Sequence, residues 1–289
     1  MALDVQKLRR RLENIQDLPI LSSVAMNIAS RIHSPSANAA EIGQLIEHDP
    51  ALTARVLQLV NSAYYGFPHR IRSVQHAVVI LGFGKIKSVV TAVSVYDASG
   101  RGPQRVIDPR RLWQHGIGVA IAAKEILSEL APHVPSEDAF TAGLLHDIGK
   151  IIYDQYLPDL YTPVENLVAA EPGRTLLSAE QELLGVTHAA VGRWLAERWH
   201  LPTMLQHVIA YHHQPARAPD NRDLVGVIHL ADAFVRALGV GHGGDQGINP
   251  MDGEIISRYN LTKDYINQAM ERIVGELSRA REFFEMVDS

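Results

Sequence analysis

The stretch IEHDPALTARVLQLVNSAYYG, residues 46–66, indicates the fold class of this chain. Its apolar side chains recur at i, i+4, i+7 and i+8, the period of one face of an α-helix, at Leu52, Val56, Leu59 and Val60. Asp49 followed by Pro50 is typical of an N-cap with proline at the first helical position. The stretch therefore predicts an amphipathic helix that buries one face.

The same period continues through most of the chain, for example at Val191, Leu195 and Trp199. Several polar residues stand where further helices should begin: Ser73, Ser136, Thr187 and Thr262. No segment shows a convincing strand pattern. We therefore expect an all-α protein of roughly a dozen helices.

One interruption separates two parts of the chain. The stretch DASGRGPQRVIDP, Asp97–Pro109, contains two glycines and two prolines and breaks the apolar period. We expect a multi-helix N-terminal bundle packed against a second helical subdomain. The predicted parts are an N-terminal helical half at 1–97, a linker at 98–109, a second half at 110–238, and a glycine-rich loop with a C-terminal helix at 239–289.

The composition limits the chemistry that the chain can use. Among 289 residues, 27 Lys and Arg stand against 32 Asp and Glu, a formal net charge of −5, so nucleic acid is not the default partner. Cysteine is absent, which excludes disulfides, thiolate metal sites and cysteine nucleophiles. Fourteen histidines leave imidazole as the abundant ligand for a transition metal.

The chain carries no evident membrane signal. Its first residues, MALDVQKLRRRLENIQ, are charged throughout and lack the apolar core of a signal peptide. No run of about 18 apolar residues occurs. We therefore expect a soluble, cytoplasmic protein without a membrane partner.

The stretch AGLLHDIGK, residues 142–150, places His146 and Asp147 side by side after an apolar helix. Adjacent helical side chains diverge by about 100°, yet an imidazole and a carboxylate there can both reach one ion in front of the helix. Nitrogen and hard oxygen ligands suit a divalent transition metal, with iron as the first candidate and manganese or zinc as alternatives. Lys150, one turn on, would overhang the same site and could meet a phosphate.

Three amphipathic segments of the first half resemble the HDOD family of bacterial regulatory proteins. They begin at Leu18, Ile46 and Ile71, and carry Asp49-Pro50, Asn61-Ser62-Ala63 and Leu81-Gly82 in the family's order. The resemblance extends from about Ile15 into the region of His212. It implies an all-helical fold, a role in signal transduction, and an HD-like second half that has lost catalytic residues in many members.

The histidine-rich half resembles the HD phosphohydrolase superfamily in the order of its polar residues. Matched residue by residue, the four ligands of a single-metal site are His115, His146, Asp147 and Asp232. The additional ligands of a two-metal site, as in the HD-GYP branch, match His188 and either His212 or His213. If the site is catalytic, Asp147 would bridge a hydroxide and Lys150 would neutralise developing charge.

Two functions remain open on these residues. The segment QPARAPDNRDL after His213 lacks the glycine-tyrosine-proline signature of HD-GYP proteins, which favours a regulator that binds a protein partner and a phosphate-bearing or nucleotide ligand. The complete ligand set favours a metal-dependent phosphohydrolase or a cyclic nucleotide phosphodiesterase. A third reading is that the polar residues are structural remnants that cross-link helices.

The other polar and aromatic residues are expected to have structural rather than functional roles. Glu180 and Glu182 could approach a metal but fit solvated positions better, and His229 could orient a ligand or lie on the surface. Tryptophans 113, 194 and 199 fit core positions. The other histidines fit caps, loops, the surface or the core: His33, His48, His69, His76, His133, His200, His207 and His242. An arginine cluster could bind nucleic acid but better fits a solvated linker: Arg101, Arg105, Arg110 and Arg111.

Overall fold

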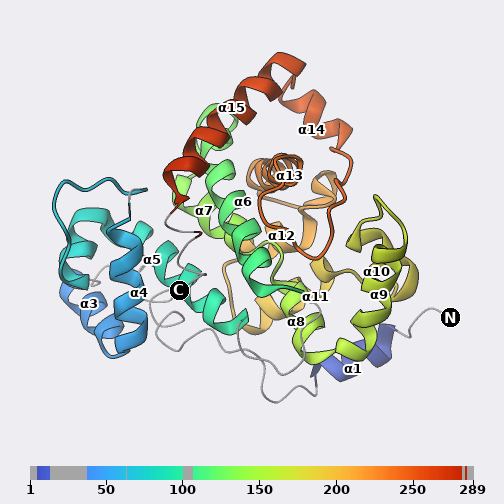
Figure 1. Ribbon diagram of the computed structural model, residues 1–289, viewed down its shortest axis with the longest axis horizontal. Helices are drawn as coiled ribbons and strands as arrows, with labels where there is room; N and C mark the ends of the chain where they lie inside the picture. The colour runs from blue at the N-terminus through green and yellow to red at the C-terminus, as the bar shows by residue number, and fades with distance from the viewer. Residues whose placement is uncertain (1–4, 14–37, 63, 100–106, 282–283, 285–289) are drawn as a thin grey trace. The chain divides into compact units, whose positions relative to one another are not determined.

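The computed structural model describes residues 5–13, 38–62, 64–99, 107–281 and 284. Within these ranges every regular element is a helix and none is a strand, so the predicted all-α class is confirmed (Figure 1). The first of the three family-like segments, which begins at Leu18, lies outside the described residues, as do His33, Arg101 and Arg105.

The chain forms two compact units. One comprises Met1–Leu18 and Arg101–Ile273, and the other comprises Pro19–Gly100 and Val274–Ser289. The division falls between residues 18 and 19, between residues 100 and 101, and between residues 273 and 274. Packing of the first half against the second stays a prediction.

Among the described residues of the smaller unit, three helices pack on one another: α3 (Ala39–Glu47), α4 (Pro50–Val60) and α5 (Val74–Ser99). Two of them begin at side-chain caps. The Asn38 side chain accepts a hydrogen bond from Glu41 N, and Asp49 accepts from the amides of the first turn of α4, as its place before Pro50 predicts. The core between them is apolar and includes Ile42, Ile46, Val56, Val60, Val74 and Ile86.

Asn61 fixes the connection that follows α4. Its Nδ2 donates to Leu57 O at 2.7 Å and to Ile71 O at 2.8 Å, and its Oδ1 accepts from Ile71 N at 2.7 Å. One side chain therefore ends the helix and holds the start of the next helical segment beside it.

The long helix α5 is bent at Gly82, whose φ of 79° lies in the left-handed region. Its stretch Val74–Thr91, with a mean hydropathy of 1.2, is long and apolar enough to span a membrane by length and composition. The bend and the packing of α5 on α3 and α4 are instead typical of a core helix.

The larger unit holds the remaining described helices, which Figure 1 labels, except that the last of them, α15, continues past Ile273 into the residues of the smaller unit. α6 packs against α7 and α13, and α11 packs against α8 and α12. Their bounds are α1 Val5–Glu13, α6 Pro109–Leu130, α7 Ser136–Leu145, α8 Ile148–Tyr156, α9 Pro158–Ala170, α10 Leu176–Leu183, α11 His188–Arg198, α12 Thr203–Tyr211, the 3₁₀ turn η1 Pro215–Arg217, α13 Arg222–Ala237, α14 Gly253–Arg258 and α15 Lys263–Arg279.

Gly149 lets α8 and α11 approach each other closely. A Cβ atom at this position would lie 1.9 Å from His188 O and 2.6 Å from Gly192 N. No side chain fits there without separating the helices. Because Asp147 precedes α8 and His188 opens α11, this close approach brings the two polar residues together.

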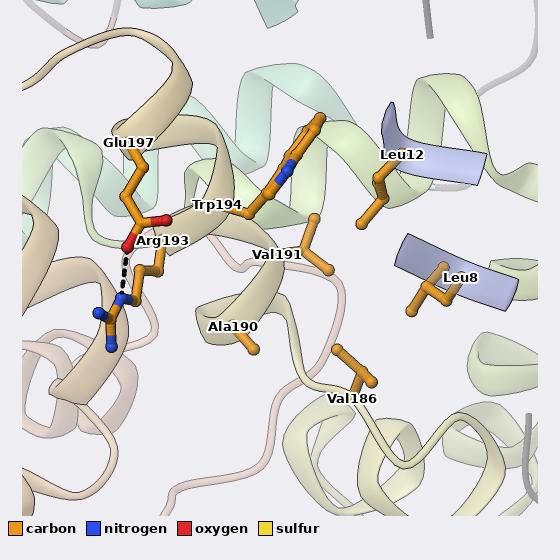
Figure 2. A pocket seen from close by; sticks show the side chains of 8 residues that line it. All are labelled: Leu8, Leu12, Val186, Ala190, Val191, Arg193, Trp194 and Glu197. Atoms are coloured by element: carbon orange, nitrogen blue, oxygen red, sulfur yellow. Dashed lines mark hydrogen bonds and ion pairs between the residues drawn. The ribbon is translucent and has the colours of Figure 1, made fainter. Parts of the chain in front are cut away.

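The short helix α1 packs its apolar face against α11. Figure 2 shows Leu8 and Leu12 facing Val191 across a pocket of about 330 Å³. At the edge, both terminal nitrogens of Arg11 donate to the Asp159 carboxylate at 2.8 Å. This paired contact fixes the orientation of α1 on the unit.

Two expectations at helix starts and in the core need correction. Ser136 is the first residue of α7 and Pro135 occupies the cap position, because the helix begins one residue earlier than expected. Trp113 is buried, as expected. Trp194 and Trp199 are only half-buried, because Trp194 lines the pocket beside α1 and Trp199 lies at the end of α11.

Replacing Asn61 with alanine removes the two hydrogen bonds that join the end of α4 to Ile71 and the one that its side chain donates to Leu57 O within α4. We expect the free energy of unfolding to fall by about 2 kcal/mol, because each neutral hydrogen bond contributes roughly 0.5–1.5 kcal/mol. Chemical denaturation followed by circular dichroism measures the change. Exposed Gln75→Ala is the matched control, and an equal, small effect of both substitutions would contradict the role of Asn61.

Candidate metal centre

The predicted ligands converge in one cluster, some from the ends of helices in the larger unit and some from positions within its helices. All are buried except His213, which is half-buried. His115 lies on α6, His146 caps the C-terminus of α7, Asp147 precedes α8, His188 opens α11, His212 and His213 follow α12, and Asp232 lies on α13. Helix ends supply most of the set, because His146, Asp147, His188 and His212 stand at the first or last residue of a helix or beside it.

Asp147 lies at the centre of the cluster. Its Oδ2 atom lies 3.3 Å from His146 Nε2, 3.7 Å from His115 Nε2 and 2.7 Å from Lys150 Nζ. Its Oδ1 atom lies 3.2 Å from His188 Nε2 and 3.7 Å from His212 Nε2. The two oxygens of one carboxylate therefore face two separate groups of imidazoles.

These groups have the size of metal sites. One consists of His115, His146 and Asp147, and the other of Asp147, His188, His212 and His213. Within each group the ligand atoms lie within 4.8 Å of one another. Because Asp147 belongs to both, a carboxylate could bridge two ions, the arrangement expected of a two-metal centre.

The histidine rings are held with Nε2 toward Asp147. His146 Nδ1 lies 2.6 Å from Gly143 O, and His212 Nδ1 lies 3.0 Å from Ile209 O. A carbonyl only accepts, so each Nδ1 carries the proton and donates it. The Nε2 atoms are thereby left with lone pairs that point into the cluster.

Several of the imidazole nitrogen atoms that point into the cluster are suited to coordinate a cation. His146 Nε2 and His212 Nε2 are buried and have no hydrogen-bond partner. Both ring nitrogens of His115 are likewise buried and without a hydrogen-bond partner. Such buried nitrogens are normally satisfied, because leaving one unpaired costs about 1–3 kcal/mol. Imidazole nitrogens and a carboxylate form a donor set that suits a divalent transition metal.

Asp232 lies at the edge of the cluster and is already paired. Its Oδ1 is 3.0 Å from His115 Nε2 and accepts from Arg236 Nε at 2.8 Å. The second arm of Arg236 donates to Asp245 at 2.7 Å. A buried guanidinium therefore holds the Asp232 carboxylate in place.

Burial and charge set the protonation of the cluster. Burial lowers the pKa of His115 and of His213, and lowers that of His212 to about 4. Burial opposes ionisation of Asp147, but the charges of His146 and Lys150 outweigh it and hold the pKa of this carboxyl well below its usual range. At neutral pH the neutral forms of His115, His212 and His213 are therefore favoured beside the Asp147 carboxylate.

Glu180 is a site residue that the sequence reasoning placed wrongly. It is fully buried, and its Oε2 accepts from His188 N at 2.8 Å and from His188 Nδ1 at 2.7 Å, while Tyr161 donates to Oε1 at 2.9 Å. The solvated position expected for it is correct only for Glu182, which is exposed and paired with Arg174. The available signal was the eight-residue spacing from Glu180 to His188, which a turn between two helices can close.

Lys150 and His229 also occupy definite positions. Lys150 is buried and held against Asp147, so no phosphate reaches it in this conformation. His229 is buried, which excludes the surface alternative, and it contacts neither Asp147 nor Asp232. Its Nδ1 donates to His212 O at 2.8 Å and its Nε2 accepts from Asp252 N at 2.9 Å, so it supports the backbone that carries His212.

The remaining histidines follow their ordinary expectations. His48 donates to Gln44 O at the end of α3, and His69, His76, His133 and His200 are exposed. His207 contacts Asn221, and His242 lies in the glycine-rich loop. None of them belongs to the candidate groups of ligands found among the described residues.

Comparison with known proteins agrees with this fold. The chain is 27% identical over 230 residues to a protein of Treponema pallidum (strain Nichols), a match that covers 78% of this chain and 44% of that relative. The chain therefore spans less than half the length of this curated relative.

Two solved structures are similar over nearly the whole chain. An HDOD domain protein from Geobacter sulfurreducens is 25% identical with a TM-score of 0.81, covering 98% of this chain and 99% of that one. A proposed phosphohydrolase from Shewanella amazonensis SB2B is 23% identical with a TM-score of 0.75, covering 97% of each, and shows the fold alone. The HDOD domain model matches residues 18–215, and the chain belongs to the HDOD domain family.

Proposed function

We propose that this chain is a cytoplasmic signal-transduction protein that acts through ligand and protein binding, and that its larger unit binds one or two divalent transition-metal ions. The observation that carries the proposal is the position of Asp147, whose two carboxylate oxygens each face two imidazole Nε2 atoms in a buried cluster. Family membership supports the regulatory part of the proposal.

The ligands divide between two positions around Asp147. His115, His146 and Asp232 would complete the first position, and His188, His212 and His213 the second. A bound ion would supply Lewis acidity and lower the pKa of a coordinated water. Iron is the first candidate and manganese or zinc the alternatives, since all three accept imidazole and carboxylate ligands.

Regulation is favoured over turnover by the burial of the centre. Lys150 is 0% exposed and Asp147 is 4% exposed. Hydrolysis requires an open coordination position and a path for the phosphoester, whereas an ion that only ties helices together needs neither. The proposed partners are a signalling protein and a phosphate-bearing or nucleotide ligand.

Metal-dependent phosphohydrolysis is the second candidate, supported by the two groups that share Asp147 and by the adjacent Lys150. In that case Asp147 would orient the attacking water and Lys150 would stabilise negative charge on the phosphoryl group. The fold that the chain shares with the Shewanella protein is compatible with either function.

Metal loading and turnover can be measured on the same samples. We expect the intact protein to take up one or two equivalents of iron, manganese or zinc by elemental analysis, His146→Ala to lose most of this uptake, and exposed His133→Ala to keep it. We expect no steady hydrolysis of bis(p-nitrophenyl) phosphate. Turnover that disappears in His146→Ala would establish the phosphohydrolase instead, and absence of uptake under every loading condition would refute the metal site.

Glu180→Gln tests the support of His188. The amide would keep the volume but lose the charge that holds His188 Nδ1–H, so we expect metal affinity to fall by about 10- to 100-fold. Isothermal titration calorimetry measures the affinity. Glu182→Gln, two residues away but exposed, is the matched control and should leave the affinity unchanged.

Metal binding should depend on pH through His188. Burial alone would lower the pKa of His188, but the Glu180 carboxylate outweighs it and raises the pKa to about 9. A cation must displace this proton, so affinity should rise about tenfold per pH unit between about pH 6.5 and 8.5 and level off above about pH 9. Titrations in buffers of different ionisation enthalpy count the released proton, and a flat profile would exclude His188 as a ligand.

A further inference from the structure

Residues 239–252, the strap, lie directly over the polar cluster. At Gly243 a Cβ atom would be 2.4 Å from Lys150 Nζ and 3.1 Å from Asp147 Oδ2. At Gly241, where φ is 58°, it would be 2.4 Å from both His115 N and Arg111 O. Only backbone without side chains fits this close to the cluster, which accounts for the burial of Lys150.

The strap is held by one central ion pair. Asp245 is buried, and its Oδ1 accepts from Arg236 Nη1 at 2.7 Å and from Gly247 N at 3.0 Å. Its Oδ2 accepts from Leu176 N at 3.1 Å, at the start of α10. Arg236 also donates to Gly247 O at 3.1 Å. The side chains of Arg236 and Asp245 therefore hold the strap against α13 and the start of α10.

The same guanidinium reaches the cluster. Arg236 Nε donates to Asp232 Oδ1 at 2.8 Å, and that oxygen lies 3.0 Å from His115 Nε2. The chain of contacts Asp245, Arg236, Asp232 and His115 therefore joins the strap to the candidate ligands. Removing either carboxylate would leave a buried guanidinium without one of its two charged partners.

Weaker contacts hold the two ends of the strap. His242 N donates to Arg111 O at 3.1 Å on α6, and Asp252 N donates to His229 Nε2 at 2.9 Å on α13. These anchors lie at either side of Gly243, and between them the strap is held by the Arg236–Asp245 pair and by Asn249, whose Nδ2 lies 3.5 Å from His213 Nδ1. The strap, Asp232 and Arg236 all lie beyond residue 215, where the match to the family model ends.

We propose that the strap is a latched cover, that Arg236 and Asp245 form its latch, and that opening it admits an anionic, phosphate-bearing ligand to Lys150. Arg236 is a positioning residue, since it acts through Asp232 and Asp245 and touches no reacting atom. The cover follows from the contacts alone, whereas the choice of ligand rests on the proposed function. The two parts can therefore fail separately.

The accessibility of Lys150 tests the cover in metal-free, full-length protein. An amine-acetylating reagent is applied at low dose, and mass spectrometry compares the rate at Lys150 with the rate at exposed Lys263 in the same molecule. We expect Lys150 to be protected in the wild type. Asp245→Asn should raise its rate by about 10- to 100-fold, the factor that corresponds to losing charge-assisted hydrogen bonds. Asp264→Asn, at an exposed site on α15, should not change it.

Gly241→Ala separates opening of the strap from general unfolding. Its Cβ would lie 2.4 Å from the backbone atoms Arg111 O and His115 N and push the strap away while every latch bond remains available. Hydrogen exchange should rise in residues 239–252 and stay low in α6 and α7. The cover is overturned if Lys150 reacts as fast as Lys263 in the wild type, or if neither variant exposes it.

Inorganic phosphate tests the ligand. In Asp245→Asn, millimolar phosphate should slow the acetylation of Lys150, and in the wild type it should have no effect. Equal rates with and without phosphate in the opened variant would overturn the anionic ligand while leaving the cover in place. Failure to bind metal in the loading experiments would affect neither measurement.

Discussion

The arrangement of the larger unit depends on one buried carboxylate, that of Asp147. An isolated charge in a protein interior is costly, and it is retained only where surrounding groups compensate for it. Here Lys150 Nζ donates to one oxygen, and a cation bound among the four imidazole Nε2 atoms that face the two oxygens would supply further positive charge. Each of these groups arrives on a different helix or helix end, so satisfying Asp147 also requires α6, α7, α11 and α12 to meet at one point.

A second layer of contacts makes this meeting specific. Backbone carbonyls hold the rings of His146 and His212, Glu180 holds His188, and Arg236 holds Asp232. These partners orient nitrogen and oxygen atoms that would otherwise rotate freely, as in known metal sites. Close backbone packing at Gly149 adds the steric condition, because it allows His188 to reach Asp147.

Binding and turnover place different demands on such a centre. Binding an ion requires converging lone pairs, which the buried Nε2 atoms provide. Turnover also requires space for a substrate beside the ion, and the strap occupies the position next to Lys150 and Asp147. Under the proposals made above, the same cluster would serve as a regulatory site while the strap stays closed, and the balance between the two proposed functions would depend on how readily the strap moves.

The helical class and the start of α4 at Asp49 and Pro50 were predictable from the sequence, because caps and the 3.6-residue period are local properties. The residues that gather around Asp147 were predicted through the resemblance of their order to the HD superfamily. The burial of Glu180, the pairing of Asp232 with Arg236 and the strap over Lys150 were not, since they join positions that approach only when separate helices pack. Spacing along a chain reports which side chains can share a helix face, but the desolvation that decides their charge and access arises only from tertiary contacts.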